Sequence, residues 1–503
     1  MKRKDTFFDT NHLSGDIKNR AIRGGLVTSA SHGIQVFLRF ASIVVLARLL
    51  IPEHFGLIGM VTSLTILIER FQDLGLGDAI VQRKEITHEQ VSTLFWINLA
   101  ICAFFTLIVV LLAKLIAWFY GDERLIWITI ALASNFVFAG SAIQHQALIR
   151  RQMRFDHFAL IKIISITFGF GLAIVLAWQG YGYWALVWKE LGRTFMNAVL
   201  AWSFCSWRPG LPVRNSGVRS MLKFGYNVTG YNMLFYLSNN LDSILIGKFA
   251  GAAPLGLYSR AKQLTAIPVG QLFEPIQYVS LPALGILQDN PQRYRSYFLK
   301  MLAVLCFLYM PIVVYLAIYA HPLVLLTLGP QWMAAVPIFK LLAIAMFLQP
   351  IVRMLGLILL SNAMTKRYLI WGLVNSIILV TAFTVGIQWS TIGVAASWSV
   401  AAGASFLFSL VFIFDGTPIS QWNVFAILYR PVTASMVMGI VLWKTYDLLE
   451  FDNLLIQLAL SILLGGFVYL ITWLIFPGGY RKVMEFISYP LMVLKRKNAF
   501  SSS

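Results

Sequence analysis

The chain has 503 residues, of which 58% are apolar and only 12% are charged. Soluble domains carry about a quarter charged residues, and the mean hydropathy here is +0.74. Apolar stretches of roughly 20 residues, the length that crosses a bilayer, recur along the whole chain. This composition excludes a soluble globular protein and indicates an all-α polytopic membrane protein.

Fourteen membrane helices are predicted, and most are separated by Pro or Gly turns such as Ile51-Pro52 and Gly329-Pro330. No segment between them is long enough to hold a soluble domain. The predicted helices cover residues 24–50, 55–81, 91–119, 125–149, 157–178, 181–204, 219–248, 254–285, 298–320, 334–361, 368–388, 391–414, 424–446 and 454–476.

Basic residues concentrate in alternate loops, for example Arg83-Lys84, Arg150-Arg151 and Lys366-Arg367, whereas the loops near residues 180, 329 and 390 have none. The positive-inside rule therefore predicts that both termini lie in the cytoplasm. The formal charge of +19 reflects this topology and attraction to anionic membrane lipid. Because the basic residues are spread over many short segments, no nucleic-acid partner is predicted.

Two segments 200 residues apart resemble each other. Residues 44–58 read VVLARLLIPEHFGLI, and residues 244–258 read ILIGKFAGAAPLGLY. Arg48 then corresponds to Lys248, and Gly56 to Gly256. Internal repeats of this kind are common in transporters, where the substrate path runs between the halves. We therefore expect spans 1–6 and 7–12 to form two similar bundles.

Ionisable residues inside the predicted spans are the candidate functional residues, because each costs a few kcal/mol at the bilayer centre. Cations outnumber acids among them, which favours an anionic ligand such as a phosphate or pyrophosphate. Part of the set is equally explained by pairing along one helix face, as for Glu190 with Arg193 and Arg70 with Asp73. The candidate ligands of the substrate are Arg39, Arg70, Lys189, Arg193, Arg260, Lys262, Lys340 and Arg353. The candidate ion carriers are Glu69, Asp73, Asp242 and Glu274.

Other motifs add little. Cys102, Cys205 and Cys306 lie in apolar surroundings and have no metal-site spacing, so we expect small buried hydrophobes. Gly24-Gly25 and the pair Gly169 and Gly171 are typical of close helix packing. The sequence contains no nucleotide-binding motif, HExxH or GxSxG, so we predict no cofactor, no metal and no enzymatic activity.

Two stretches carry a family resemblance. Residues 46–98 (LARLLIPEHFGLIGMVTSLTILIERFQDLGLGDAIVQRKEITHEQVSTLFWIN) and 241–264 (LDSILIGKFAGAAPLGLYSRAKQL) resemble the oligosaccharide flippases of the colanic-acid-exporter type, within the multidrug/oligosaccharidyl-lipid/polysaccharide exporter superfamily. The resemblance implies two six-helix lobes followed by two extra helices. The predicted parts are an N-terminal cytoplasmic segment 1–23, an N-lobe 24–207, a C-lobe 208–415, two further spans within 416–476 and a basic tail 477–503.

The same resemblance implies a function. The family moves undecaprenyl-pyrophosphate-linked oligosaccharides from the cytoplasmic to the periplasmic leaflet for polysaccharide synthesis. Our hypothesis is an alternating-access flippase whose cations, from both lobes, hold the pyrophosphate while the polyprenyl tail stays in lipid. Polymerase and chain-length or export proteins are further candidate partners. Two alternatives remain open: a cation-coupled multidrug antiporter of the same fold, which the excess of cations disfavours, and a non-transporting scaffold of a polysaccharide assembly complex.

Overall fold

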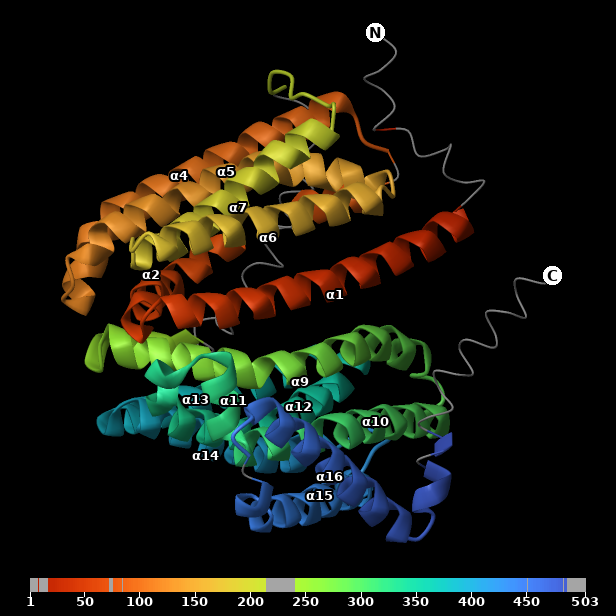
Figure 1. The fold of residues 1–503 in the computed structure, drawn as a ribbon. Coiled ribbons are helices and arrows are strands. Elements are labelled where there is room, and N and C mark those ends of the chain that lie inside the picture. Colours follow the sequence, from red (N-terminus) through yellow and green to blue (C-terminus); the bar gives the residue numbers. More distant parts are fainter. Residues whose placement is uncertain are drawn as a thin grey trace. The chain divides into compact units, whose positions relative to one another are not determined.

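The computed structural model describes residue 8 and residues 17–71, 76–83, 85–213, 240–449, 451–482 and 484–485, and the regular structure within these ranges is helical (Figure 1). The chain divides into two compact units, Met1–Ser259 and Arg260–Ser503. Among the described residues, nine segments are long and apolar enough to cross a membrane. The lobe boundaries at 207 and 415 stay a prediction.

Most helices of the first unit follow the predicted spans to within three residues, but the first helix begins at Ile17, seven residues before its predicted start. The predicted span 55–81 contains two described helices, α2 and α3, and residues 72–75 between them lie outside the described residues. Of the predicted span 219–248, residues 240–248 are described, within a helical segment 240–249. The helices are α1 (Ile17–Leu49), α2 (Pro52–Phe71), α3 (Leu76–Gln82), α4 (His88–Tyr120), α5 (Arg124–Arg151), α6 (Phe155–Trp178) and α7 (Tyr183–Phe204).

The second unit contains the remaining helices. The first of them, α9 (Ala252–Ile286), begins in the last residues of the first unit. Helix α10 begins seven residues before its predicted start, because Asn290 caps it by accepting the N–H of Arg293 (3.1 Å) and Pro291 occupies its first turn. The helices are α9 (Ala252–Ile286), α10 (Pro291–Ile318), α11 (Ala320–Thr327), α12 (Val336–Ser361), α13 (Thr365–Gly386), α14 (Ser390–Phe412), α15 (Gln421–Lys444) and α16 (Leu454–Ile475).

The same order of packing occurs in both units. In the first, α4 packs on α5, and α7 packs on both α5 and α6. In the second, α10 packs on α12, and α14 packs on both α12 and α13. The three predicted buried cysteines are all buried free thiols. The same pattern of contacts among four helices therefore occurs in both units.

The turns between matching helices are also alike. Met153, between α5 and α6, has φ 53°, and Ala363, between α12 and α13, has φ 55°, although neither is glycine. Each donates its N–H to the carbonyl three residues earlier, at 2.9 and 3.2 Å. The residue after each donates to the carbonyl five residues before itself, at 3.1 and 2.9 Å. This backbone equivalence at an offset of 210 residues supports an internal duplication.

The repeat found in the sequence brings two glycines together inside the first unit. A methyl group on Gly56 of α2 would overlap the carbonyl oxygen of Ala252, and one on Gly256 would overlap that of Pro52. The contact is reciprocal at the 200-residue offset, since Pro52 corresponds to Ala252. Both glycines therefore stand where two helix backbones touch, the situation that requires a residue without Cβ.

Candidate functional site

Helices α6 and α7 approach closely at a position that carries charge. A Cβ atom on Gly169 of α6 would lie 2.5 Å from the carbonyl oxygen of Lys189 and 2.9 Å from Cβ of Arg193. No atom lies within 4 Å of the equivalent point on Gly171. Gly24 likewise faces the Phe155 ring, whereas Gly25 meets nothing. The packing role expected for both glycine pairs thus belongs to the first member of each.

The charged residues of α7 lie on one side of that contact. Glu190 pairs with Arg193, whose Nη2 and Nε are both 2.9 Å from Oε2, as the three-residue spacing predicts. The Nζ atom of Lys189 lies 3.7 Å from Oε1 of the same carboxylate. Lys189 and Glu190 are half-buried, with 29% and 32% of their side-chain areas exposed, and Arg193 is exposed at 45%. One carboxylate is therefore shared by two cations.

Further cations from α1, α5 and α6 act on the same region. Lys162 of α6 experiences the charges of Arg193, Arg150 and Arg39, and its Nζ lies 5.2 Å from the centroid of the Phe158 ring. Arg150 is paired with Asp78 at 3.2 Å. Within the described part of the chain, no carboxylate pairs with Lys162 or Arg39. We call the following residues the α1/α6/α7 cluster: Arg39, Lys162, Lys189, Glu190 and Arg193.

Lys162 was missed by the sequence prediction. Lys162 lies near the start of the predicted span 157–178, where a lysine side chain can extend to the membrane surface. One signal was available: Lys162 and Gly169 are seven residues apart, so they share a face of α6. The face that packs near the charges of α7 therefore carries its own cation.

Three of the predicted cations of the second unit lie near an aromatic ring or a polar side chain. The Nζ atom of Lys262 on α9 lies 4.8 Å from the Trp398 ring centroid, and the Arg353 guanidinium lies 5.9 Å from that of Phe273. Arg260 donates to the side-chain oxygen of Gln263 at 2.5 Å. Lys340 is exposed on α12. Lys262 and Arg353 thus each lie near an aromatic ring.

The candidate ion carriers have different settings. Asp242 is fully buried, and its carboxylate accepts the Tyr258 hydroxyl at 2.8 Å and the Ser243 N–H at 2.7 Å. Glu274 is exposed on α9 and lies near enough to Arg353 to act on it electrostatically. Asp73 and the side chains of Glu69 and Arg70 lie outside the described residues, so the predicted roles of these three stay predictions.

The α1/α6/α7 cluster has the chemistry of an anion site. The Glu190 carboxylate is shared by Lys189 and Arg193. Lys162 and the exposed Arg39 add two positive charges from the neighbouring helices α6 and α1, which gives the five residues a net charge of +3. Like charges gathered inside apolar segments are unfavourable unless a counter-ion or water offsets them, and a bound anion would do so. Guanidinium groups form paired hydrogen bonds with phosphate oxygens, and ammonium groups contribute point charges. A ligand with two or more negative charges fits this arrangement.

Comparisons with known proteins agree with the fold and the composition. The chain is 26% identical to the lipopolysaccharide biosynthesis protein WzxC of Escherichia coli (strain K12), over 90% of this chain and 89% of that one. It is 30% identical to the amylovoran biosynthesis protein AmsL of Erwinia amylovora, over 61% and 79%. The solved structure of the lipid II flippase MurJ, in an inward closed conformation, is similar with a TM-score of 0.71 and 15% identity, over 92% of this chain and all of that one.

A family model gives the assignment. Residues 45–337 match the model described as polysaccharide biosynthesis protein, which is more than half of the chain and includes α2 to α7 and α9. The expected resemblance is confirmed, as is the all-helical exporter fold. This chain is a multi-pass membrane protein that belongs to the polysaccharide biosynthesis protein family.

Proposed function

We propose that this protein is a flippase that moves polyprenyl-pyrophosphate-linked oligosaccharides across the bacterial inner membrane by alternating access. The observation that carries the proposal is the net positive α1/α6/α7 cluster inside apolar helices of a polysaccharide biosynthesis protein. The pyrophosphate binds to the cluster, and the polyprenyl tail remains in lipid. No chemical bond changes in this cycle, so the protein is a transporter and not an enzyme.

The charge of the cluster favours this substrate class over cationic drugs. A pyrophosphate carries at least two negative charges, whereas a drug cation would be repelled by Lys162 and Arg193. Each charge-assisted hydrogen bond contributes about 1.5–3 kcal/mol. Glu190 holds Arg193 and Lys189 in place (2.9 and 3.7 Å) before the ligand arrives. Arg39, Lys162 and Arg193 are accordingly the proposed ligands of the pyrophosphate in the first unit.

Both termini are proposed to lie in the cytoplasm. The turn after α5 follows Arg150 and Arg151, while the turn after α6, at Gly180, is uncharged. In intact spheroplasts, an impermeant thiol reagent is expected to label a cysteine at position 180 and to spare one at the exposed position 156. The reverse pattern would overturn this orientation.

An ion gradient is proposed to supply the free energy. Asp242 and Glu274 are the carriers that lie within the described residues, and Glu69 and Asp73 complete the proposed set. If Asp242 carries the ion, Asp242→Asn removes the dependence of transport on the gradient while transport down the substrate gradient persists. An unchanged dependence in Asp242→Asn excludes this residue as the carrier.

The central experiment measures translocation of an undecaprenyl-pyrophosphate-linked oligosaccharide in vesicles that contain the purified protein. We expect Arg193→Gln and Lys162→Gln each to lower the rate about tenfold, the loss of one charge-assisted contact. Lys444→Gln, which removes an exposed cation at the end of α15, is the matched control and keeps the wild-type rate. If both cluster variants translocate at the wild-type rate, the proposed binding mode is wrong.

A further inference from the structure

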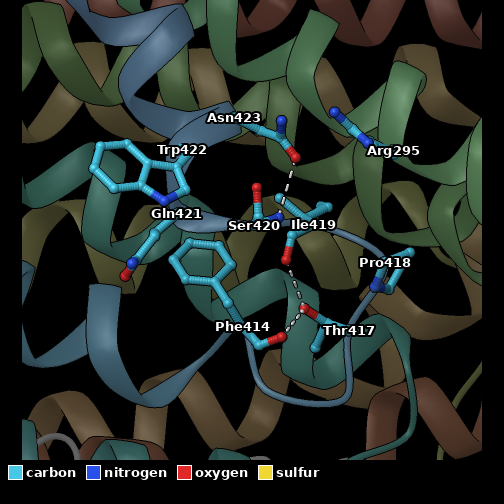
Figure 2. Close-up of a pocket in the computed structure, with 9 residues that line it drawn as sticks. All are labelled: Arg295, Phe414, Thr417, Pro418, Ile419, Ser420, Gln421, Trp422 and Asn423. Atoms are coloured by element: carbon cyan, nitrogen blue, oxygen red, sulfur yellow. Dashed lines mark hydrogen bonds between the residues drawn. The ribbon is translucent and has the colours of Figure 1, made fainter.

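A second anion site is indicated in a pocket of about 420 Å³ in the second unit, where α14 ends and α15 begins (Figure 2). Arg295 enters it from α10, and the other lining residues come from the α14–α15 loop and the first turn of α15. These residues are Phe414, Thr417, Pro418, Ile419, Ser420, Gln421, Trp422 and Asn423.

The loop that forms the pocket is held in one conformation by its own hydrogen bonds. The Thr417 hydroxyl lies 2.9 Å from the carbonyl oxygen of Phe414 and 3.2 Å from that of Ile419 (Figure 2). Ser420 and Asn423 form a capping box at the start of α15, in which the Ser420 N–H donates to Oδ1 of Asn423 at 3.1 Å. The pocket is therefore built before any ligand binds.

Arg367, at the start of α13, supports the loop from outside the pocket. Its guanidinium donates to the carbonyl oxygens of Phe412 and Asp415 and lies 5.3 Å from the centroid of the Phe412 ring. These bonds fix the end of α14 to the start of α13. Arg367 thus acts on the shape of the loop, and the charge that enters the pocket is that of Arg295.

The lining carries one positive charge and mixes polar with apolar side chains. Among the nine described lining residues, Arg295 is the charged one, and none is a carboxylate. Asn423, Gln421 and Ser420 add uncharged polar side chains, and the N-terminal end of α15 adds a partial positive charge. Arg295 is exposed, so a ligand can reach its guanidinium. These features select an anion with oxygen acceptors.

Exposed aromatic side chains on the first turns of α15 indicate that the pocket lies at the level of the lipid headgroups. Trp422 is 72% exposed, and Phe425, one turn further, is 42% exposed. Tryptophan is enriched at the level of lipid headgroups. The pocket volume lies near the lower end of the range of about 300–1,000 Å³ for ligand sites, so it matches one headgroup better than an oligosaccharide.

We propose that this pocket binds the phosphodiester headgroup of an anionic membrane lipid, with Arg295 as the phosphate ligand. Phosphate oxygens can accept two parallel N–H groups of a guanidinium, and basic pockets between membrane helices recognise such headgroups. The site is separate from the α1/α6/α7 cluster and does not depend on the transported substrate. Lipid bound here would couple the α14–α15 loop to the composition of the surrounding membrane leaflet.

The test is a lipid titration of the purified full-length protein, followed by native mass spectrometry. The probes are phosphatidylglycerol and phosphatidylcholine, which share chain composition but differ in headgroup charge. We expect the wild type to prefer phosphatidylglycerol, and Arg295→Gln to weaken that binding about fivefold while phosphatidylcholine binding is unchanged. Arg293→Gln, two residues away and not part of the lining, is the matched control and changes the affinity by less than about twofold.

Each outcome decides the proposal. Equal affinities in Arg295→Gln and the wild type, or an equal loss in Arg293→Gln, would mean that the pocket does not hold the headgroup. Full displacement of phosphatidylglycerol by an equal concentration of inorganic phosphate would assign the site to a soluble anion instead. If Arg295→Gln fails to fold, Arg295→Lys replaces it, and a partial loss of affinity is expected because the charge remains without the paired donors.

Discussion

The α6–α7 pair of the first unit and the α13–α14 pair of the second are built alike but charged differently. Each pair follows a turn with the same hydrogen bonds and a residue at positive φ, Met153 or Ala363. Yet α6 and α7 carry the α1/α6/α7 cluster, whereas α13 beyond Arg367 and all of α14 contain no Asp, Glu, Lys or Arg. The backbone arrangement of α6 and α7 therefore recurs in α13 and α14, but their charged residues do not.

This contrast shows which features the repeat preserves. At the offset of 210 residues, Lys162 corresponds to Gly372. The equivalent helix position in the second unit therefore has no ammonium group. The second unit holds cations against aromatic rings, as Lys262 does with Trp398. We infer that turn geometry and helix contacts keep the repeated fold, and that the charges of the α1/α6/α7 cluster are a specialisation of the first unit.

The largest expected loss of stability tests whether Gly56 and Gly256 have equivalent structural roles. Gly56→Ala and Gly256→Ala each place a methyl group on a backbone carbonyl of the facing segment, so each should lower the free energy of unfolding by about 3 kcal/mol. Gly270→Ala, where nothing lies within 4 Å, is the control and is expected to be neutral or slightly stabilising. Thermal unfolding in detergent measures all three. A loss in one of the two glycine variants without the other would break the equivalence.

The second prediction distinguishes a cation of the α1/α6/α7 cluster from a cation that lies against an aromatic ring. Lys162→Met removes a charge repelled by Arg39 and Arg193, so stability changes by less than about 0.5 kcal/mol while translocation falls about tenfold. Lys262→Met removes a cation from the face of the buried Trp398 ring, so we expect a stability loss of about 1 kcal/mol. The stability of both variants is measured by unfolding, and their translocation rates are measured in the vesicle assay. A stability loss in Lys162→Met as large as that in Lys262→Met would show that the cluster is structural.

The sequence predicts the helices well and the site only in part. Hydropathy locates α4 to α7 to within three residues, because apolar length and turn residues act locally. It does not predict the early start of α10, which depends on the cap at Asn290. The Glu190–Arg193 pair is readable from spacing along one helix. The approach of Lys162 to Arg39 and Arg193 depends on how α1, α6 and α7 pack, and a single sequence does not specify that packing.

A smaller effect is expected at the matching turns. Met153 and Ala363 hold a left-handed conformation that costs a residue with Cβ roughly 1–2 kcal/mol and glycine almost nothing. After the entropic cost of glycine, Met153→Gly and Ala363→Gly should each raise the free energy of unfolding by about 0.5 kcal/mol. The control is Gln152→Gly, at φ −82°, which should lower it. A higher free energy of unfolding in one glycine variant and a lower one in the other would contradict the equivalence of the two turns.

The smallest effect concerns an ion pair at the start of α5 that α12 lacks, since α12 begins at the uncharged Val336. Asp122, in the α4–α5 loop, accepts Arg124 Nε at 3.0 Å and Nη2 at 2.7 Å, and these hydrogen bonds hold its pKa below the ordinary value of 3.8. A lowered pKa stabilises the fold above pH 3.8, and this stabilisation is lost as the pH falls through the folded value.

Because Arg124 is largely exposed, we expect the Asp122 contribution to be only about 0.5 kcal/mol. Unfolding measured from pH 6 down to pH 3 should therefore show a slightly steeper loss of stability in the wild type than in Asp122→Asn, with the two converging at the acid end. Identical slopes would mean that the Asp122–Arg124 pair contributes nothing. The difference between the two units would then lie in the α1/α6/α7 cluster and not in the loops that join their helices.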